Sequence, residues 1–179
     1  DGAVEPERAL LCRMAVFAGG ALIDSSPMYG SSQDVIGEAL ARLGMPKPLF
    51  AADKVWIAPG ARGPAQIERS REAWRIARFD LLQVHNLLAL QEHLPALFAM
   101  KAAQQVRYVG ITTSEGRRHR EIEQIMRSHP IDFVQVTYNV LDRDVGGEHR
   151  EHRGHRRREH RGALGHAADR RYLLARQLD

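Results

Sequence analysis

Several absences narrow what this chain can be. Its 179 residues include one cysteine, Cys12, which excludes an internal disulfide and a metal site built from several thiolates. The longest apolar runs, 10–18 and 94–100, fall well short of the roughly 20 residues that a membrane-spanning helix needs. Residues 1–6 show no basic start followed by an apolar run, as a signal peptide would. We therefore expect a cytoplasmic protein with no membrane partner.

Most of the chain has no net charge. The net charge is +4, but residues 146–179 alone hold nine arginines against five acidic residues, so residues 1–145 are neutral. The first 145 residues therefore do not predict a basic surface for nucleic acid. Hydrophobic residues make up 44% of the chain and charged residues 27%, which is the balance of a globular protein with one sizeable core.

Residues 1–145 alternate short apolar runs with amphipathic segments. Strands are predicted over 21–24, 49–55, 81–85, 108–112 and 133–136. Helices are predicted over 9–19, 64–78, 94–104 and 116–128. A further helix is predicted to begin at a cap, Ser31 or Ser32, and to end at Gly44. Near-continuous apolar strands separated by helices indicate an α/β fold with a parallel sheet. Both an open doubly wound sheet and an arc of a (β/α)8 barrel fit, although the absence of a G-x-G-x-x-G sequence disfavours a nucleotide-binding doubly wound fold.

Four polar residues lie at the carboxyl ends of three consecutive predicted strands. Asp24 ends one strand, Tyr29 follows in its loop, Lys54 lies near the end of the next, and His85 ends the third. Each has an ordinary explanation when taken alone: a loop carboxylate, a packing aromatic, a solvated charge and a satisfied core histidine. Parallel strands bring their carboxyl ends to one rim, where such folds hold their active sites. Together, the four residues therefore favour a catalytic site.

The chemistry of this set is consistent. A lysine ammonium beside a tyrosine lowers the pKa of the phenol from about 10, and a carboxylate holds the lysine charged. The tyrosine can then act as a general acid toward a carbonyl oxygen. Hydride must come from a cofactor, because no side chain supplies it.

Three segments resemble the aldo-keto reductase superfamily. Residues 23–32, with Asp24, Tyr29 and Gly30, resemble its Asp-x-x-x-x-Tyr-Gly motif. Residues 52–56 resemble its lysine strand, and residues 80–86 its histidine strand. The resemblance covers about residues 9–144. It implies a (β/α)8 TIM barrel, NADPH-dependent reduction of aldehydes and ketones, Tyr29 as proton donor, and Asp24, Lys54 and His85 in support.

The resemblance also implies a cofactor site. Thr112 and Thr113 stand where the family has the Ser-Asn pair that holds the nicotinamide amide, and Gln135 matches its carboxamide-binding glutamine. Asp53 stands where members often have Ser or Thr, and strand alternation predicts that it points away from Lys54. No metal site is predicted in this region.

About five of the eight βα units are recognisable, so an incomplete barrel is expected. We divide the chain into a partial barrel, 1–145, and a low-complexity Arg/His-rich tail, 146–179. Two explanations remain for the tail, an out-of-frame translation or a divergent terminus, and the abrupt change of composition favours the first. Residues 148–162 include no large apolar residue and predict a solvated or disordered segment. Because the family's phosphate-gripping units are not recognisable, we expect NADPH to bind weakly or not at all.

The tail, residues 146–179, offers two functional possibilities of its own. His149, His152 and His155 have a spacing that can hold a transition metal, but histidines in a basic segment more often bind metals adventitiously. The cluster Arg156–Arg158 can neutralise phosphates, yet interleaved acids and the lack of aromatics make nucleic acid an unfavoured partner.

Three functional hypotheses follow. The first is a carbonyl reductase acting on a small carbonyl substrate. The second is a non-catalytic, truncated or frameshifted relic of such an enzyme. The third and weakest is a barrel enzyme that uses Lys54 as a Schiff-base amine.

Overall fold

A computed structural model describes residues 22–45, 49–60, 62–115 and 118–137, together with the backbone of 163–167 and 170–176. The chain divides into two compact units, the first made of residues 1–84 and 88–108 and the second of 85–87 and 109–179. The helix predicted over 9–19 lies outside the described residues.

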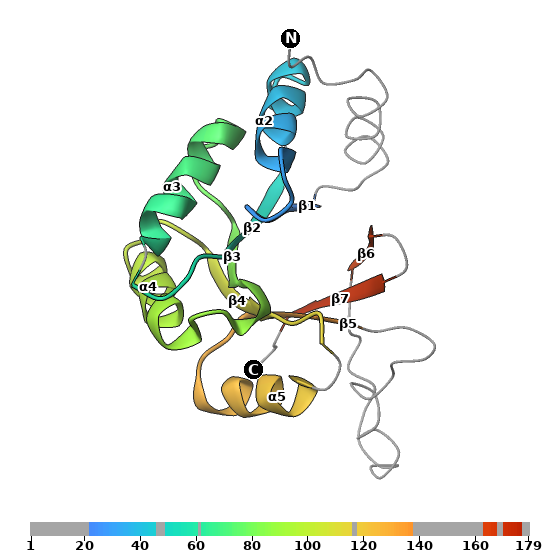
Figure 1. The fold of residues 1–179 in the computed structure, drawn as a ribbon. Helices are drawn as coiled ribbons and strands as arrows, with labels where there is room; N and C mark the ends of the chain where they lie inside the picture. The colour runs from blue at the N-terminus through green and yellow to red at the C-terminus, as the bar shows by residue number, and fades with distance from the viewer. Residues whose placement is uncertain are drawn as a thin grey trace. The chain divides into compact units, whose positions relative to one another are not determined.

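The first unit contains three parallel strands in sequence order. They are β1 (Leu22–Asp24), β2 (Phe50–Val55) and β3 (Leu81–Val84), shown in Figure 1. Asp24 pairs with Ala52, and Lys54 pairs with Gln83. The strands form where they were predicted, because most of their residues are apolar and can be buried on both faces.

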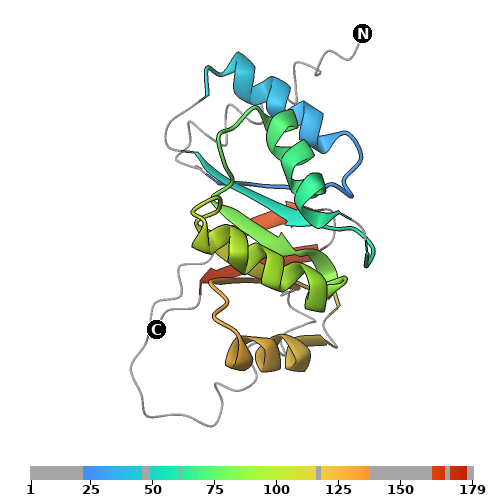
Figure 2. The same ribbon diagram turned by 90° about the vertical axis from the view of Figure 1, so that its left-hand side faces the viewer.

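Three helices pack on the same face of these strands. They are α2 (Ser32–Arg42), α3 (Gly63–Trp74) and α4 (Leu90–Ala102), and Figure 2 shows them in front of the sheet. Leu82 on β3 and Ile67 on α3 are buried between the two layers. Trp74 and Phe79 are also buried and meet edge to face, with ring centroids 5.2 Å apart. This apolar layer lies on the side of the sheet opposite to Lys54 and Gln83.

The α3 helix ends four residues earlier than predicted, at Trp74 rather than Arg78. Arg75 adopts a left-handed conformation with φ of 57°, and the amide of Ile76 bonds back to the carbonyl of Arg71 at 3.3 Å. This turn brings Phe79 back against Trp74. Burial of two aromatic rings therefore overrides the helical pattern that continues in the sequence.

The α4 helix begins four residues before the predicted start at Leu94. Pro95 therefore lies inside the helix. Contacts with residues outside the helix stabilise this extra turn. The Glu92 carboxylate accepts a hydrogen bond from the amide of Gly60 at 2.8 Å. Buried His93 also hydrogen-bonds through Nε2 to the carbonyl of Ile57 at 2.9 Å. Long-range contacts decide this end of the helix.

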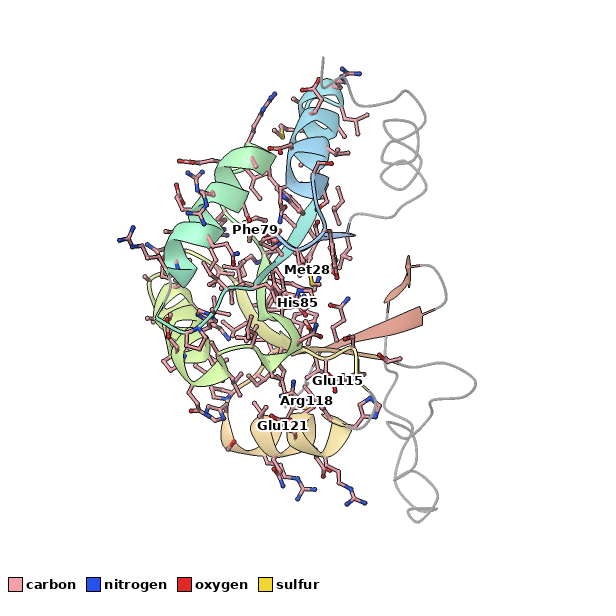
Figure 3. All side chains as sticks on the ribbon, in the orientation of Figure 1. Met28, Phe79, His85, Glu115, Arg118 and Glu121 are labelled. Atoms are coloured by element: carbon pink, nitrogen blue, oxygen red, sulfur yellow. The ribbon has the colours of Figure 1, made fainter. Side chains whose placement is uncertain are left out.

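In the second unit, two parallel strands flank a helix. They are β4 (Tyr108–Thr112, of which Tyr108 belongs to the first unit) and β5 (Phe133–Thr137), with α5 (His119–Ser128) between them in sequence. Ile122 and Ile125 are buried on the inner side of α5, as predicted, and Met126 is half-buried. A 3-10 turn, His85–Leu87, belongs to this unit. Figure 3 marks Arg118 and Glu121, which form an ion pair at 2.8 Å at the start of α5.

Two strands lie in the tail, where none was predicted. They are β6 (Ala163–Ala167) and β7 (Arg170–Arg176), and β7 pairs antiparallel with both β5 and β6. The sequence 172–174 is the only hydrophobic cluster of the tail, and an apolar run beside the open edge of β5 can add a strand to it. An antiparallel neighbour departs from the parallel order of a (β/α)8 barrel. The rest of the tail lies outside the described residues.

Candidate active site

The first candidate side chains lie on one face of the first unit's sheet. Asp24 is the last residue of β1, and Lys54 is the fifth of the six residues of β2. Successive side chains of a strand alternate between faces, so Lys54 points away from the helices while Asp53 points toward them. Gln83, the register partner of Lys54, shares its face.

Lys54 and Asp24 form an ion pair that is largely withdrawn from water. The Lys54 ammonium donates to Asp24 Oδ2 at 2.7 Å, and the exposed fractions of the two side chains are 1% and 18%. The ammonium also donates to the backbone carbonyl of Ser25 at 2.8 Å. A buried charge is tolerated only when it is paired and hydrogen-bonded. The contacts with Asp24 and with the Ser25 carbonyl therefore compensate for the burial of the Lys54 ammonium.

Tyr29 lies above this pair in the loop between β1 and α2. Its amide bonds to the carbonyl of Ser26 at 3.0 Å, and Gly30 follows with φ of 59°, a conformation that glycine adopts without strain. The Lys54 ammonium is 5.6 Å from the centre of the Tyr29 ring, within the range of a cation–π contact. The Tyr29 side chain is 48% exposed. A substrate can therefore reach a phenol that borders a buried cation.

Gln83 is part of this group, and the sequence analysis missed it. Its Nε2 donates to Asp24 Oδ1 at 3.2 Å, while Lys54 binds the other oxygen. The available signal was one amide in an otherwise apolar strand, Leu81–Val84. That signal is weak, because an isolated polar residue in a strand usually satisfies a local hydrogen bond.

Asp53 points away from the site, as strand alternation predicted. Its two carboxylate oxygens accept hydrogen bonds from Gln33 Nε2 on α2 at 3.0 and 3.1 Å. Gln33 in turn accepts the indole N–H of Trp74. Burial raises the pKa of Asp53 to about 6, and the hydrogen bond from Gln33 partly offsets this effect. Asp53 is thus a structural group between β2 and the helices.

His85 comes directly after β3 and is 5% exposed. It belongs to the second unit, whereas Asp24, Tyr29 and Lys54 belong to the first. The next residue, Asn86, is left-handed with φ of 51°. Its amide donates to Thr112 Oγ1 at 3.0 Å, and its side-chain oxygen accepts the amide of Ser114 at 2.9 Å. Asn86 therefore connects the turn of His85 to the end of β4.

The predicted cofactor residues lie at the carboxyl ends of β4 and β5. Thr112 and Thr113 are 3% and 1% exposed, and Gln135 is half-buried. The amide of Thr113 donates to the carbonyl of Gln135 at 2.9 Å, so the three residues lie together. The Thr113 hydroxyl accepts the amide of Glu115 at 3.1 Å and donates to its carbonyl at 3.3 Å. The Thr112 hydroxyl accepts one bond from Asn86 and keeps its proton for a further partner.

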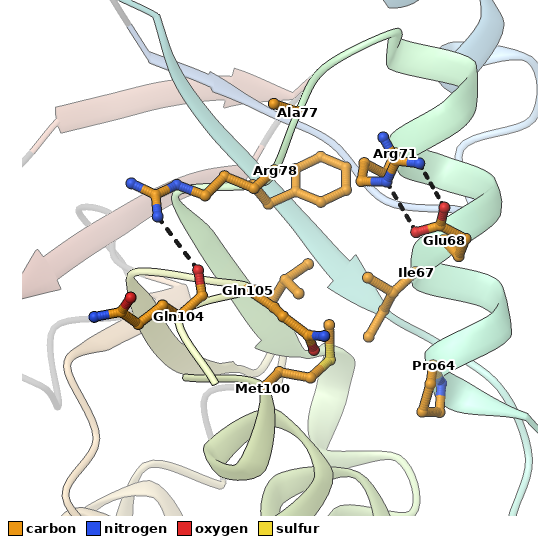
Figure 4. A pocket seen from close by; sticks show the side chains of 11 residues that line it. Pro64, Ile67, Glu68, Arg71, Ala77, Arg78, Met100, Gln104 and Gln105 are labelled. Atoms are coloured by element: carbon orange, nitrogen blue, oxygen red, sulfur yellow. Dashed lines mark hydrogen bonds and ion pairs between the residues drawn. The ribbon is translucent and has the colours of Figure 1, made fainter. Parts of the chain in front are cut away.

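A cavity of about 490 Å³ lies elsewhere, between α3 and α4 (Figure 4). Its wall includes Ile67, Leu82 and Met100, from the helix-covered side of the sheet. The charged groups at its border are already bound: Arg71 to Glu68, and Arg78 to the carbonyl of Gln104 at 3.3 Å. The cavity holds none of the predicted catalytic residues.

Neither a metal-ligand cluster nor a candidate membrane-spanning helix occurs among the described residues. No group of three or more His, Cys, Asp or Glu side chains there is arranged to hold a metal ion. Within the same residues, no helix combines the length and apolar character needed to cross a membrane.

Comparison with known proteins identifies the family. The model of the aldo/keto reductase family matches residues 2–157. This chain belongs to the aldo/keto reductase family. The resemblance predicted from the three sequence motifs is thereby confirmed, as is the expectation of a partial chain.

Individual relatives agree with the assignment. The aldo/keto reductase chain is 27% identical to aldo-keto reductase str7 of Strobilurus tenacellus in an alignment 150 residues long, and the match covers 79% of this chain and 44% of that relative. Its fold matches the crystal structure of an aldo/keto reductase from Brucella melitensis, with a TM-score of 0.65, 18% identity, and coverage of 80% of this chain and 60% of that one.

A second solved structure is the aldo-keto reductase of Klebsiella pneumoniae in complex with NADPH. The match has a TM-score of 0.59 and 21% identity, and it covers 71% of this chain and 45% of that one. The aldo/keto reductase chain thus spans about half the length of these relatives. At these identities, the two solved structures establish the fold, an incomplete (β/α)8 barrel.

Proposed function

We propose that this chain reduces a small aldehyde or ketone with NADPH, and that Tyr29 is the general acid. The observation that carries the proposal is the buried Asp24–Lys54 ion pair with the half-exposed Tyr29 ring 5.6 Å from the ammonium. A cation held at that position favours the phenolate over the phenol. The role proposed for Lys54 is to make Tyr29 a better proton donor.

The proposed step is balanced by one hydride and one proton. Hydride adds to the carbonyl carbon, the C=O π electrons move to oxygen, and the Tyr29 hydroxyl donates its proton to that oxygen to form the alcohol. Lys54 stabilises the phenolate that remains until solvent returns the proton, and Asp24 keeps Lys54 in place. His85, at the end of the next strand, is the residue we assign to orienting the carbonyl.

NADPH is the cofactor that would supply the hydride when bound. Thr112, Thr113 and Gln135 suit its nicotinamide carboxamide, because they offer uncharged donors and acceptors that lie together and are largely buried. The free proton of the Thr112 hydroxyl fits the carboxamide oxygen. The NADPH complex of the relative from Klebsiella pneumoniae supports this choice of cofactor.

The two alternatives have less support. A non-catalytic relic has no need to retain an ion pair buried this deeply, since paired charges are often no better for stability than apolar residues of similar size. A Schiff-base lysine must be a free amine, whereas Lys54 donates to both Asp24 and the Ser25 carbonyl.

The test uses the full 179-residue chain with 1 mM NADPH and an aromatic aldehyde, and it follows absorbance at 340 nm. We expect aldehyde-dependent oxidation of NADPH that falls at least 100-fold in Tyr29→Phe. Tyr108→Phe is the matched control, because Tyr108 stacks on Phe50 at the opposite end of the strands and should change the rate less than twofold. Equal rates in the wild type and Tyr29→Phe would refute the role of Tyr29, and no oxidation in the wild type would refute the function.

A further inference from the structure

Gln83 has an arrangement that the stability of the fold does not explain. Its side chain is fully buried, and the other residues of its strand β3, Leu81, Leu82 and Val84, are apolar. Nε2 donates to Asp24 Oδ1 at 3.2 Å. Among the described residues, the buried Oε1 has no hydrogen-bond partner.

The carboxylate of Asp24 determines which way the amide faces. An ionised carboxylate only accepts hydrogen bonds, so Nε2 must face it. Turning the amide by 180° would place Oε1 against a negatively charged oxygen. The position therefore requires a donor toward Asp24 and leaves the amide oxygen without a bond.

The unpaired amide oxygen of Gln83 lowers the stability of the fold. A buried polar group without a partner costs about 1–3 kcal/mol, and replacing it with an apolar group of the same shape is nearly neutral or stabilising. A methionine or leucine would suit an apolar strand better. The reason for an amide here must lie in its contact with Asp24.

We propose that Gln83 is a positioning residue of this active site. It binds Asp24 Oδ1 while Lys54 binds Oδ2, so the carboxylate is held from both sides. Asp24 is 18% exposed, so its carboxylate borders water. By holding Asp24, Gln83 keeps the Lys54 ammonium beneath the Tyr29 ring. Only the kinetic consequence of this inference rests on the proposed function.

The chemical reactivity of Lys54 measures its positioning without any need for enzyme activity. The chain has three lysines, Lys47, Lys54 and Lys101, so each can be followed separately by mass spectrometry of peptides. The probe is acetic anhydride at limiting concentration, applied to the whole chain. Lys101, on α4 and half-exposed, is the internal reference for the amount of reagent that reacts, and the melting temperature reports whether a variant is unfolded.

Gln83→Met keeps the length of the side chain and removes both the donor and the unpaired oxygen. We expect the labelling of Lys54 relative to Lys101 to rise at least fivefold, while the melting temperature stays equal or increases. Leu82→Met is the matched control, because Leu82 is buried in the same strand on the opposite face. It should leave the labelling ratio within twofold of the wild type.

An unchanged ratio in Gln83→Met would overturn the proposal. So would a melting temperature that falls in step with the increase in labelling, since that result describes an ordinary structural residue. Gln83→Leu repeats the test if the methionine variant does not fold. Failure of both to fold would show that the amide supports the fold itself, and the proposal would be wrong.

The kinetic measurement then separates this inference from the proposed function. In NADPH-linked aldehyde reduction, Gln83→Met should lower kcat at least tenfold and change KM for the aldehyde less than twofold, because the variant disturbs the proton donor and not substrate binding. An unchanged kcat beside an active wild type would contradict the inference. Inactivity of the wild type would refute only the proposed function, since the labelling ratio would still report on Gln83.

Discussion

The Lys54 ammonium lies 2.7 Å from the Asp24 carboxylate, and the lysine side chain is 1% exposed. This contact joins the fold and the proposed chemistry, because it accounts for a buried positive charge and places that charge near Tyr29. Its loss should therefore affect both.

Replacing Asp24 with asparagine should destabilise the chain strongly. The change leaves a buried ammonium without its counter-ion, and breaking a buried pair in this way costs about 3–5 kcal/mol. Urea denaturation at pH 7 measures the free energy of unfolding. Glu38→Gln is the control, because Glu38 pairs near the surface with Arg42 and Arg75, in contacts that are worth less than about 1 kcal/mol each. Equal stability of the two variants would show that Lys54 does not depend on Asp24.

The buried carboxyl of Asp53 should make the stability of the wild-type chain depend on pH, and an asparagine variant should lack this dependence. Its pKa rises from 3.8 to about 6 on folding, so the unfolded chain releases the proton at lower pH than the folded one. The contribution of Asp53 is then fully present below about pH 4, falls as the pH rises toward 6, and is constant above that. The shift of about two pKa units corresponds to about 3 kcal/mol.

We therefore expect the free energy of unfolding of Asp53→Asn, relative to the wild type, to increase by about 3 kcal/mol between pH 4 and pH 7. Asparagine keeps an oxygen that can accept from Gln33, and other carboxylates affect both proteins alike and cancel in the difference. Urea titrations at four pH values measure it. A difference that is independent of pH would mean that the buried carboxyl does not titrate as described.

Gly37 should not tolerate a side chain. It lies on α2, where a Cβ atom would come within 1.8 Å of the carbonyl oxygen of Ala73 on α3. Alanine normally favours a helix over glycine by about 1 kcal/mol, yet here it should destabilise the chain by about 2 kcal/mol or more, because the two helices must separate. Thermal unfolding should show a lower midpoint for Gly37→Ala. Glu38→Ala, at the neighbouring half-exposed position, serves as the control, and a higher midpoint for Gly37→Ala would contradict the close packing of α2 on α3.

NADPH should bind this chain more weakly than micromolar. The contacts we assign, from Thr112, Thr113 and Gln135, serve only the nicotinamide end, and a few hydrogen bonds of about 1 kcal/mol each do not reach the roughly 8 kcal/mol of a micromolar complex. Titration followed by protein fluorescence measures the dissociation constant, and Thr112→Val should raise it several-fold. Thr137→Val is the control, because the buried Thr137 hydroxyl has no partner among the described residues. Micromolar affinity in the wild type would refute this expectation.

The site was predictable in part, for a physical reason. Asp24 and Lys54 were expected to lie together because apolar strands end in polar residues and parallel strands place those ends at one rim, and the two side chains form an ion pair. That His85 takes part in the site stays a prediction. Gln83 could not be found in this way, since the sequence does not tell which buried amide meets which carboxylate. The partners of Asp53 were equally hidden, although alternation along β2 predicted correctly that it points away from Lys54.

Over residues 22–137 the sequence by itself determined the order of strands and helices, because apolar periodicity is a local property that each segment carries alone. Tertiary structure decided where some of those elements end and which groups meet. The α3 helix ends at Trp74 so that Phe79 can pack on it, and α4 gains a turn through the contacts of Glu92 and His93. Side-chain partners and helix ends depend on residues far apart in the chain, and their energies appear only when the fold brings those residues together.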